Sequence, residues 1–168
     1  MSTAAARSIE LAIGAVEFTA GNDAAQMLGA WTCWNKWCLE VHGREIEHDV
    51  WMAAFSNKMN SGRFIQVVGW CDGEPVATCD AEVSYDMMAK ELVATGANGW
   101  VDPRLRCSGV WASLADFLVH MCLLAGVNRF IAPVGAGDSA SAPWLKAMYE
   151  KKGFEVSGFY MALRKENG

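Results

Sequence analysis

The chain is 168 residues long, the length of one ordinary domain that can bury a core without disulfides or metal ions. With 52% hydrophobic and 20% charged residues, its composition excludes a disordered or low-complexity protein. Nineteen acidic against fourteen basic residues give a net charge of -5, which disfavours general attraction to nucleic acid or to an anionic membrane. We expect a single domain over residues 1–168.

The first residues of the chain show no targeting pattern. Residues 1–16 are only weakly apolar, contain one arginine and are interrupted by Glu10, so they predict neither a secretory signal nor a membrane span. We therefore expect a cytoplasmic protein that has no membrane partner.

Six cysteines are an even number, which raises the question of a disulfide framework. Residues 72–75 predict the turn of a hairpin, which places Cys71 opposite Val76 and Cys79 opposite Val68. In that register the two cysteines do not face each other. We interpret all six cysteines as reduced thiols.

Two amphipathic helices are expected after a short strand around residues 9–16. Asp23, followed three residues later by Gln26, is a capping-box pattern that opens a helix running to Gly43. One face of this helix repeats large or apolar side chains at helical spacing: Met27, Trp31, Trp34 and Cys38. The second helix ends at Ser61–Gly62, and its apolar residues are Ile46, Val50, Trp51, Ala54 and Phe55. Cys38 and His42 lie one turn apart, but no CxxC pair accompanies them, and we expect no metal site.

The middle of the chain predicts strands. Residues 64–71 and 76–85 form a hairpin around the Asp-Gly-Glu-Pro turn. Residues 91–101 form the next strand, in which Gly96 and Gly99 indicate a bulge or a close approach to the backbone.

A helix and a parallel strand follow. A helix starts at Val110 and ends near Gly126, and residues 129–134 predict a short buried strand. Because the helix forms a crossover between two strands, these strands are expected to be parallel. Residues 135–142 predict a loop, 143–152 a helix, and 154–165 the last strand, which is too short to leave a long final hairpin loop.

Three blocks carry a resemblance to a known family. Residues 101–110 read Val-Asp-Pro-Arg-Leu-Arg-Cys-Ser-Gly-Val, residues 148–154 read Met-Tyr-Glu-Lys-Lys-Gly-Phe, and residues 67–76 contain the Asp-Gly-Glu-Pro turn. In this order and spacing they resemble the GNAT superfamily of N-acetyltransferases over about residues 8–165. The resemblance implies an α/β (α+β) fold with a mixed central sheet of about six to seven strands and four helices. It also implies that two central strands are parallel and splay apart, and that acetyl-CoA is the acyl donor.

The first block is the expected acetyl-CoA site. The backbone N–H groups at a helix N-terminus attract anions, so a glycine-containing turn there can bind a pyrophosphate. The resemblance assigns cofactor contacts to Trp100, Val101, Arg104, Arg106, Cys107, Ser108, Gly109, Val110 and Trp111. An ordinary turn in which Ser108 caps the helix is the alternative interpretation of the same residues.

Two positions depart from the family pattern. Trp111 stands where the family has glycine or alanine, and its indole either fills the phosphate turn or faces the core against Leu114 or Ala115. Ala142 stands where the family has an asparagine that contacts CoA, and Ser139 or Ser141 could replace that contact.

Catalytic roles follow from the same resemblance and from strand alternation. Tyr149 matches the family tyrosine that protonates the departing thiolate, although a helix tyrosine packed in the core is the alternative. Asp80 and Glu82 are the candidate general bases, because they share one strand face opposite an apolar face. Solvated strand acids are the alternative for both.

The histidines and the tryptophans of the first helix are further candidates. His42 and His48 flank the junction of the first two helices, where they could contact an acceptor or simply lie at the surface. His120 is expected to pack or hydrogen-bond inside its helix. Three tryptophans could line an acceptor groove or belong to the core: Trp31, Trp34 and Trp37.

The sequence leaves two functions open. One is an acetyl-CoA-dependent N-acetyltransferase in which a primary amine, on a small molecule or a protein, attacks the thioester directly. The other is a catalytically degenerate module of the same fold with a structural, assembly or regulatory role. The short final strands would leave a sheet edge that favours self-association.

Overall fold

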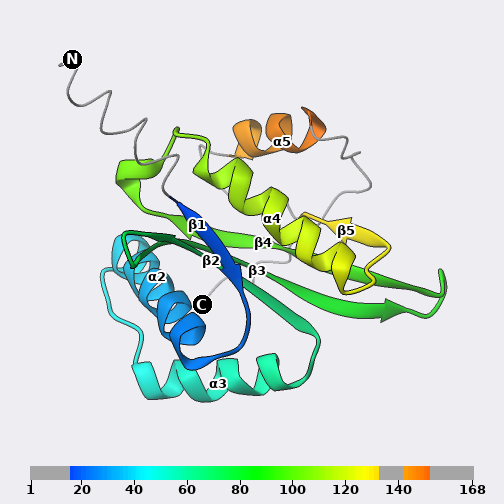
Figure 1. Cartoon of the computed structure of the whole chain (residues 1–168), viewed down its shortest axis with the longest axis horizontal. Coiled ribbons are helices and arrows are strands. Elements are labelled where there is room, and N and C mark those ends of the chain that lie inside the picture. The colour runs from blue at the N-terminus through cyan, green and yellow to red at the C-terminus, as the bar shows by residue number, and fades with distance from the viewer. Residues whose placement is uncertain (1–15, 133–141, 152–168) are drawn as a thin grey trace, which may run out of the picture. The chain divides into compact units, whose positions relative to one another are not determined.

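The computed structural model of the chain describes residues 16–132 and 142–151 (Figure 1). The chain divides into two compact units, residues 1–133 and 134–168, and each is described by itself. The elements of the first unit are β1 (Glu17–Ala20), α2 (Ala24–His42), α3 (His48–Asn60), β2 (Phe64–Cys71), β3 (Glu74–Asp86), β4 (Glu91–Val101), the short 3-10 helix η1 (Pro103–Leu105), α4 (Val110–Leu124) and β5 (Arg129–Ile131). In the second unit the described element is α5 (Ala142–Lys151).

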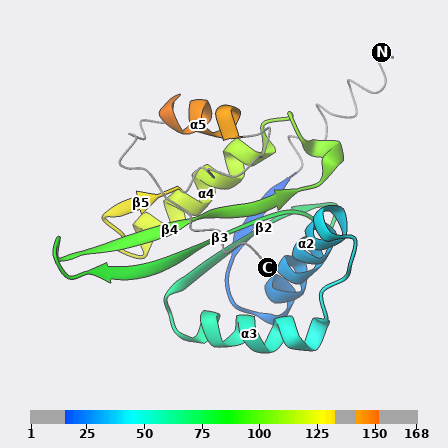
Figure 2. The ribbon, with the colours of Figure 1, turned by 180° about the vertical axis from the view of Figure 1, so that it is seen from behind.

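The described strands form one mixed sheet in the order β1-β2-β3-β4-β5. The first three pairings are antiparallel, whereas β4 and β5 are parallel and are joined by α4. The predicted parallel pair is therefore confirmed. Helix α4 covers one face of the sheet, and α2 and α3 cover the other (Figures 1 and 2).

Some of the predicted elements lie outside the described residues or are shorter than predicted. The loop at 135–141, the strand at 154–165 and most of the strand at 9–16 lie outside them. β1 occupies residues 17–20, which the sequence pattern did not predict as a strand. The strand predicted at 129–134 is described only over 129–131, and its residues are exposed or half-buried, so the prediction of a buried strand was wrong. None of the described helices is long and apolar enough to cross a membrane.

Helix α2 begins and ends where the sequence predicts. Asp23 is the N-cap, and its carboxylate accepts a hydrogen bond of 2.9 Å from the backbone N–H of Gln26. The Gln26 side chain does not complete the capping box, because its amide donates instead to the carbonyls of Thr19 and Gln66. This buried amide therefore links α2 to β1 and β2. Gly43 ends the helix with a φ of 66°, a conformation that favours glycine.

The hairpin of β2 and β3 has a tighter turn than predicted. Asp72 and Gly73 both have positive φ, at 52° and 79°, so two residues make the turn and Cys71 pairs with Glu74. The predicted pairing of Cys71 with Val76 was wrong, since the pattern suggested a four-residue turn. The conclusion about Cys71 and Cys79 holds, and all six cysteines are free.

Strand alternation separates the two faces of the sheet. The face toward α4 is apolar and packs against Leu114 and Leu118, which are completely buried. The opposite face, toward α2 and α3, carries polar residues such as Gln66, Thr78 and Asp80. The helix α3 is less buried than its apolar pattern predicted, because Val50 is 63% exposed.

The predicted bulge lies on β4. Asp80 pairs with Asn98 and Ala81 with Gly96, so β4 has one extra residue at this point. A Cβ at Gly96 would overlap the backbone carbonyl of Asp80 and lie 2.5 Å from Cα of Ala81. The bulge keeps Asn98 on the polar face of the sheet, and glycine permits the close approach of β3.

Gly96→Ala is expected to destabilise the protein because the added methyl overlaps the backbone of β3. Overpacking of this kind costs roughly 1–3 kcal/mol, which lowers Tm by roughly 3–10 °C in a chain of this length. Thermal denaturation followed by circular dichroism measures the change. Gly21→Ala is the matched control, because a Cβ there meets only an Asp23 oxygen at 3.8 Å. An equal Tm for both variants would contradict the tight contact.

Candidate active site

The turn before α4 is open at its backbone. Gly109 is the N-cap with a φ of 89°, no side chain caps the helix, and a Cβ at this glycine would meet nothing within 4 Å. The hydroxyl of Ser108 donates instead to the carbonyl of Leu105. The alternative in which Ser108 caps the helix is therefore wrong. Cys107, exposed beside it, also has a positive φ, at 66°. The first N–H groups of α4 therefore remain available to an anion.

The two arginines near this turn are bound to carboxylates. Arg104 donates to both oxygens of Asp102, at 2.9 Å and 2.8 Å. Arg106 donates to both oxygens of Glu40 on α2, at 2.6 Å each. As cofactor contacts, Arg104 and Arg106 would offer positive charge to the phosphates, but each guanidinium faces a carboxylate that offsets its charge. Sequence position alone did not reveal these partners, because one of them lies 66 residues away.

β4 has an open edge beyond Thr95 among the described residues, since its pairing with β5 ends there. The N–H of Asp102 donates to the carbonyl of Val76 on β3 at 2.8 Å. Neighbouring residues of an antiparallel strand direct their backbone groups to opposite edges, so Val101 faces the open edge and Trp100 faces β3. Of these two candidate pantetheine contacts, only Val101 presents its backbone to that edge.

Arg106 ties the end of β4 to α2. Its Nε donates to the Val101 carbonyl at 3.0 Å, while the indole N–H of the buried Trp100 donates to Glu40 at 2.9 Å. The hydrogen bond from Arg106, followed by that from Trp100, lowers the pKa of Glu40 below its usual value. The carboxylate therefore stays charged and holds both groups in place.

Trp111 packs onto the sheet. It lies against the apolar core, and its Cζ3 is 2.9 Å from where a Cβ of Gly99 on β4 would stand. Its indole nitrogen is buried without a hydrogen-bond partner in the part of the chain that the structure describes. Of the two orientations that the sequence left open, the structure has the ring turned inward.

Trp111→Gly is expected to lose stability without gaining affinity for CoA. Removing a packed tryptophan costs roughly 2–5 kcal/mol, and the backbone N–H groups that face the turn are unchanged by it. Denaturant unfolding measures the first effect, and isothermal titration with CoA measures the second, which should stay within about threefold. A rise in affinity of tenfold or more would show that the indole blocks the phosphates.

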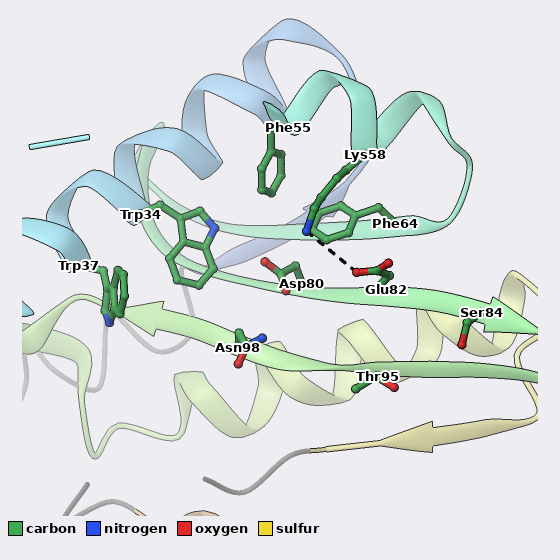
Figure 3. Close-up of a pocket in the computed structure, with 10 residues that line it drawn as sticks. All are labelled: Trp34, Trp37, Phe55, Lys58, Phe64, Asp80, Glu82, Ser84, Thr95 and Asn98. Carbon is green, nitrogen blue, oxygen red and sulfur yellow. Dashed lines mark ion pairs between the residues drawn. The ribbon is translucent and has the colours of Figure 1, made fainter. Parts of the chain in front are cut away.

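A pocket of about 550 Å³ lies on the opposite face of the sheet, under α2 and α3 (Figure 3). Its wall is aromatic and consists of Trp34, Trp37, Phe55 and Phe64. Its polar side chains are Lys58, Asp80, Glu82, Ser84, Thr95 and Asn98. The structure thus brings both candidate bases to one pocket beside the bulge of β4, together with two of the three tryptophans that were candidates for an acceptor groove.

Asp80 has the electrostatics of a proton acceptor at neutral pH. Burial raises its pKa from the ordinary 3.8 to about 7, against a smaller lowering by Lys58, while Glu82 adds to the rise. Glu82 is exposed, and its carboxylate lies 4.0 Å from Nζ of Lys58. The two acids therefore differ, and Asp80 is the candidate general base.

The raised pKa of Asp80 predicts a pH-dependent stability. The folded protein holds this proton better than the unfolded chain, so Asp80 destabilises the fold progressively as pH rises from about 4 to about 7. Asp80→Asn should therefore be more stable than wild type at pH 8, by roughly 1–4 kcal/mol, and the gain should vanish near pH 4. Denaturant unfolding at several pH values measures the difference. Glu82→Gln is the control, and a gain independent of pH would contradict the buried proton.

The remaining candidates lie elsewhere. Tyr149 is on α5, in the second unit, and Ser139 and Ser141 lie outside the described residues. His42 and His48 are exposed, pack edge-on against Trp37 and Trp31, and do not line the pocket. His120 is also exposed, so its expected packing inside α4 was wrong.

Several pocket residues were not predicted from the sequence: Phe55 as a wall residue, Lys58, Phe64, Ser84, Thr95 and Asn98. Phe55 was assigned to an apolar helix face, which gives no sign of a ligand. Asn98 precedes Gly99 at the predicted bulge, and its position beside a bulge was the one sequence feature that could have marked it as a site residue.

Comparison with known proteins places the fold among acetyltransferases. No protein-family model matches the sequence, and a comparison with curated proteins finds no match. Among solved structures, the chain is similar to an aminoglycoside acetyltransferase from an uncultured soil metagenomic sample in complex with sisomicin. That match has a TM-score of 0.69 at 13% identity and covers 90% of this chain and 99% of the other.

Two further structures show the same likeness. Glucosamine-6-phosphate N-acetyltransferase from Arabidopsis thaliana has a TM-score of 0.68 at 17% identity, covering 88% of this chain and 98% of the other. An aminoglycoside N-acetyltransferase in complex with CoA has a TM-score of 0.67 at 15% identity, covering 90% and 95%. The chain has the GNAT acetyltransferase fold that the three sequence blocks implied.

Proposed function

We propose that this chain is an acetyl-CoA-dependent N-acetyltransferase acting on a primary amine. The observation that carries the proposal is Asp80, a half-buried carboxyl whose pKa burial raises to about 7, in a pocket beside the bulge of β4. A base with this pKa can accept a proton at neutral pH. The similar structures support the reaction class, because they are acetyltransferases named for amino sugars and aminoglycosides.

The residues present fit acetyl-CoA at the backbone level. Gly109 leaves the start of α4 open, the Trp111 ring is turned toward the sheet, and among the described residues no strand pairs with the edge of β4 that the N–H of Val101 faces. When bound, acetyl-CoA supplies a thioester whose carbonyl carbon accepts a nucleophile. The N–H groups of Val110 and Trp111 would hold its pyrophosphate.

Each proton transfer of the proposed reaction is assigned to one residue. As the bond between the amine nitrogen and the carbonyl carbon forms, the carboxylate of Asp80 accepts the proton that the nitrogen loses. For the carbon–sulfur bond that breaks, the family resemblance assigns the proton donor to Tyr149, whose hydroxyl would protonate the sulfur so that it leaves as a thiol. Asp80 returns its proton to solvent, and Tyr149 regains one from it.

A degenerate binding module is the second candidate. It is favoured by Arg104 and Arg106, since both guanidinium groups are already bound to carboxylates near the phosphate turn. The experiment that separates the two is isothermal titration with acetyl-CoA, followed by assay of thiol release with a panel of primary amines. Micromolar binding together with release supports the enzyme. Absence of binding supports the module.

A further inference from the structure

The walls of the pocket are held rigid by ring-to-ring contacts. Trp34 and Trp37 meet edge-on with centroids 5.6 Å apart, and Phe55 lies stacked on Trp51 at 4.0 Å and edge-on to Phe64 at 4.9 Å. Each pocket ring therefore has a partner that fixes its orientation. Figure 3 shows Trp34 and Phe55 on the same side of the pocket, above the strand that carries Asp80. Fixed aromatic faces favour a flat ligand or a cation.

The charged side chains of the pocket suit a ligand that carries one positive charge. Two carboxylates and one ammonium line it, and the ammonium of Lys58 lies 4.0 Å from Glu82 and 5.4 Å from the centre of the Phe64 ring. Lys58 thus balances Glu82 and leaves one acid, Asp80. Among the described residues no cation lies within ion-pair distance of Asp80. A ligand with several positive charges would find no carboxylate for the second.

The indole N–H of Trp34 is a donor without an acceptor. The atom is buried and has no hydrogen-bond partner in the part of the chain that is described. In Figure 3 this nitrogen is on the side of the ring that faces the pocket. Since a buried donor is rarely left unpaired in a working site, an oxygen of the ligand is the expected partner.

We propose that the acceptor is a small arylalkylamine, in which one primary amine is joined by a short alkyl chain to an aromatic ring that carries an oxygen. This inference rests on the proposed function, because it names the substrate of that same site. The amine faces Asp80, the ring lies against Trp34 and Phe55, and the oxygen accepts from the Trp34 N–H. Polyamines and aminoglycosides are disfavoured, because Glu82 is already paired with Lys58 and cannot balance a second positive charge of the ligand.

The first experiment compares probes of known chemistry on the full chain. Tyramine, phenethylamine, n-butylamine, spermidine and kanamycin are tested for acetylation by thiol release and for binding by isothermal titration in the absence of acetyl-CoA. We expect kcat/KM for tyramine to exceed that for n-butylamine by about 10- to 100-fold and that for phenethylamine by about threefold to tenfold, the usual scale of aromatic contacts and of one hydrogen bond.

Variants assign each contact. Trp34→Phe keeps the ring but removes the N–H, so it should bring the Kd for tyramine to that for phenethylamine. Phe55→Leu should weaken both aromatic amines by about 5- to 30-fold and leave n-butylamine unchanged. Trp31→Phe is the matched control, because Trp31 is on the same helix but does not line the pocket. Wild-type affinities in both Trp34→Phe and Phe55→Leu would overturn the aromatic contacts.

Lys58→Met tests the charge argument separately. Releasing Glu82 adds an unbalanced carboxylate, so the affinity for spermidine should rise relative to that for tyramine by about threefold to tenfold. An unchanged ratio of the two affinities would contradict the assignment of Lys58.

The failures of the two proposals have different signatures. If tyramine binds tightly but no amine is acetylated, the enzymatic function is wrong and the binding class stands. If spermidine or kanamycin is acetylated better than tyramine, the function stands and the arylalkylamine class is overturned. If none of the amines binds or reacts, both are overturned.

Discussion

Asp80→Asn is expected to lower kcat/KM by about 10²- to 10⁴-fold at pH 7, the range for loss of a general base. Asparagine has nearly the same shape and keeps the pocket intact, but its amide cannot accept the proton that the amine nitrogen loses. Assay of thiol release under subsaturating amine measures the loss. Glu82→Gln is the control, because Glu82 lines the same pocket but is exposed and is paired with Lys58.

The pH profile separates a base from a structural residue. Only the ionised form of Asp80 can accept a proton, so kcat/KM of the wild type should rise with pH up to about 7 and then level off. This rise is the acidic limb of the pH profile. The limb should be absent from Asp80→Asn and retained in Glu82→Gln. A variant with the full limb and nearly full activity would transfer the role of base to another group or to water.

The same substitution should make the protein more stable and less active. Burying a carboxyl that titrates near pH 7 has a free-energy cost at higher pH, and the asparagine variant avoids it. A residue that served only the fold would show losses of both quantities. Opposite signs in stability and in activity are therefore the pattern expected of a residue kept for its chemistry.

Much of this site could be predicted because strand alternation is a local property. Asp80 and Glu82 are two residues apart on β3, so they share a face whatever the rest of the fold does. Their difference could not be predicted. Asp80 is half-buried because α2 and α3 cover that part of β3, and the pKa depends on that distant packing rather than on neighbours in the sequence.

For the turn before α4, the sequence predicted the backbone conformation but not the charge. The position of Gly109 before α4 followed from the motif, and its positive φ agrees with it. The charge of the turn did not follow, because Arg106 meets Glu40, a residue of α2 that no local pattern connects to it. The hairpin register failed for a local reason, since Asp72 adopts a positive φ that only a minority of non-glycine residues reach.

Tyr149→Phe is expected to lower kcat by about 10- to 1000-fold while leaving the Kd for acetyl-CoA within about threefold. The hydroxyl of a tyrosine can donate its proton to the sulfur as the carbon–sulfur bond breaks. Phenylalanine keeps the ring and removes only that donor. Steady-state kinetics at saturating amine and acetyl-CoA measure the change.

The split between turnover and binding distinguishes an acid from a packing residue. If Tyr149 only supported the fold, its substitution would weaken acetyl-CoA binding and lower Tm together, whereas loss of a proton donor acts on kcat alone. Tyr85→Phe is the matched control, because Tyr85 is 58% exposed near the end of β3 and outside the pocket. Unchanged turnover in Tyr149→Phe would mean that another group, or water, protonates the thiolate, and Asp80 would then be left as the one residue assigned to proton transfer.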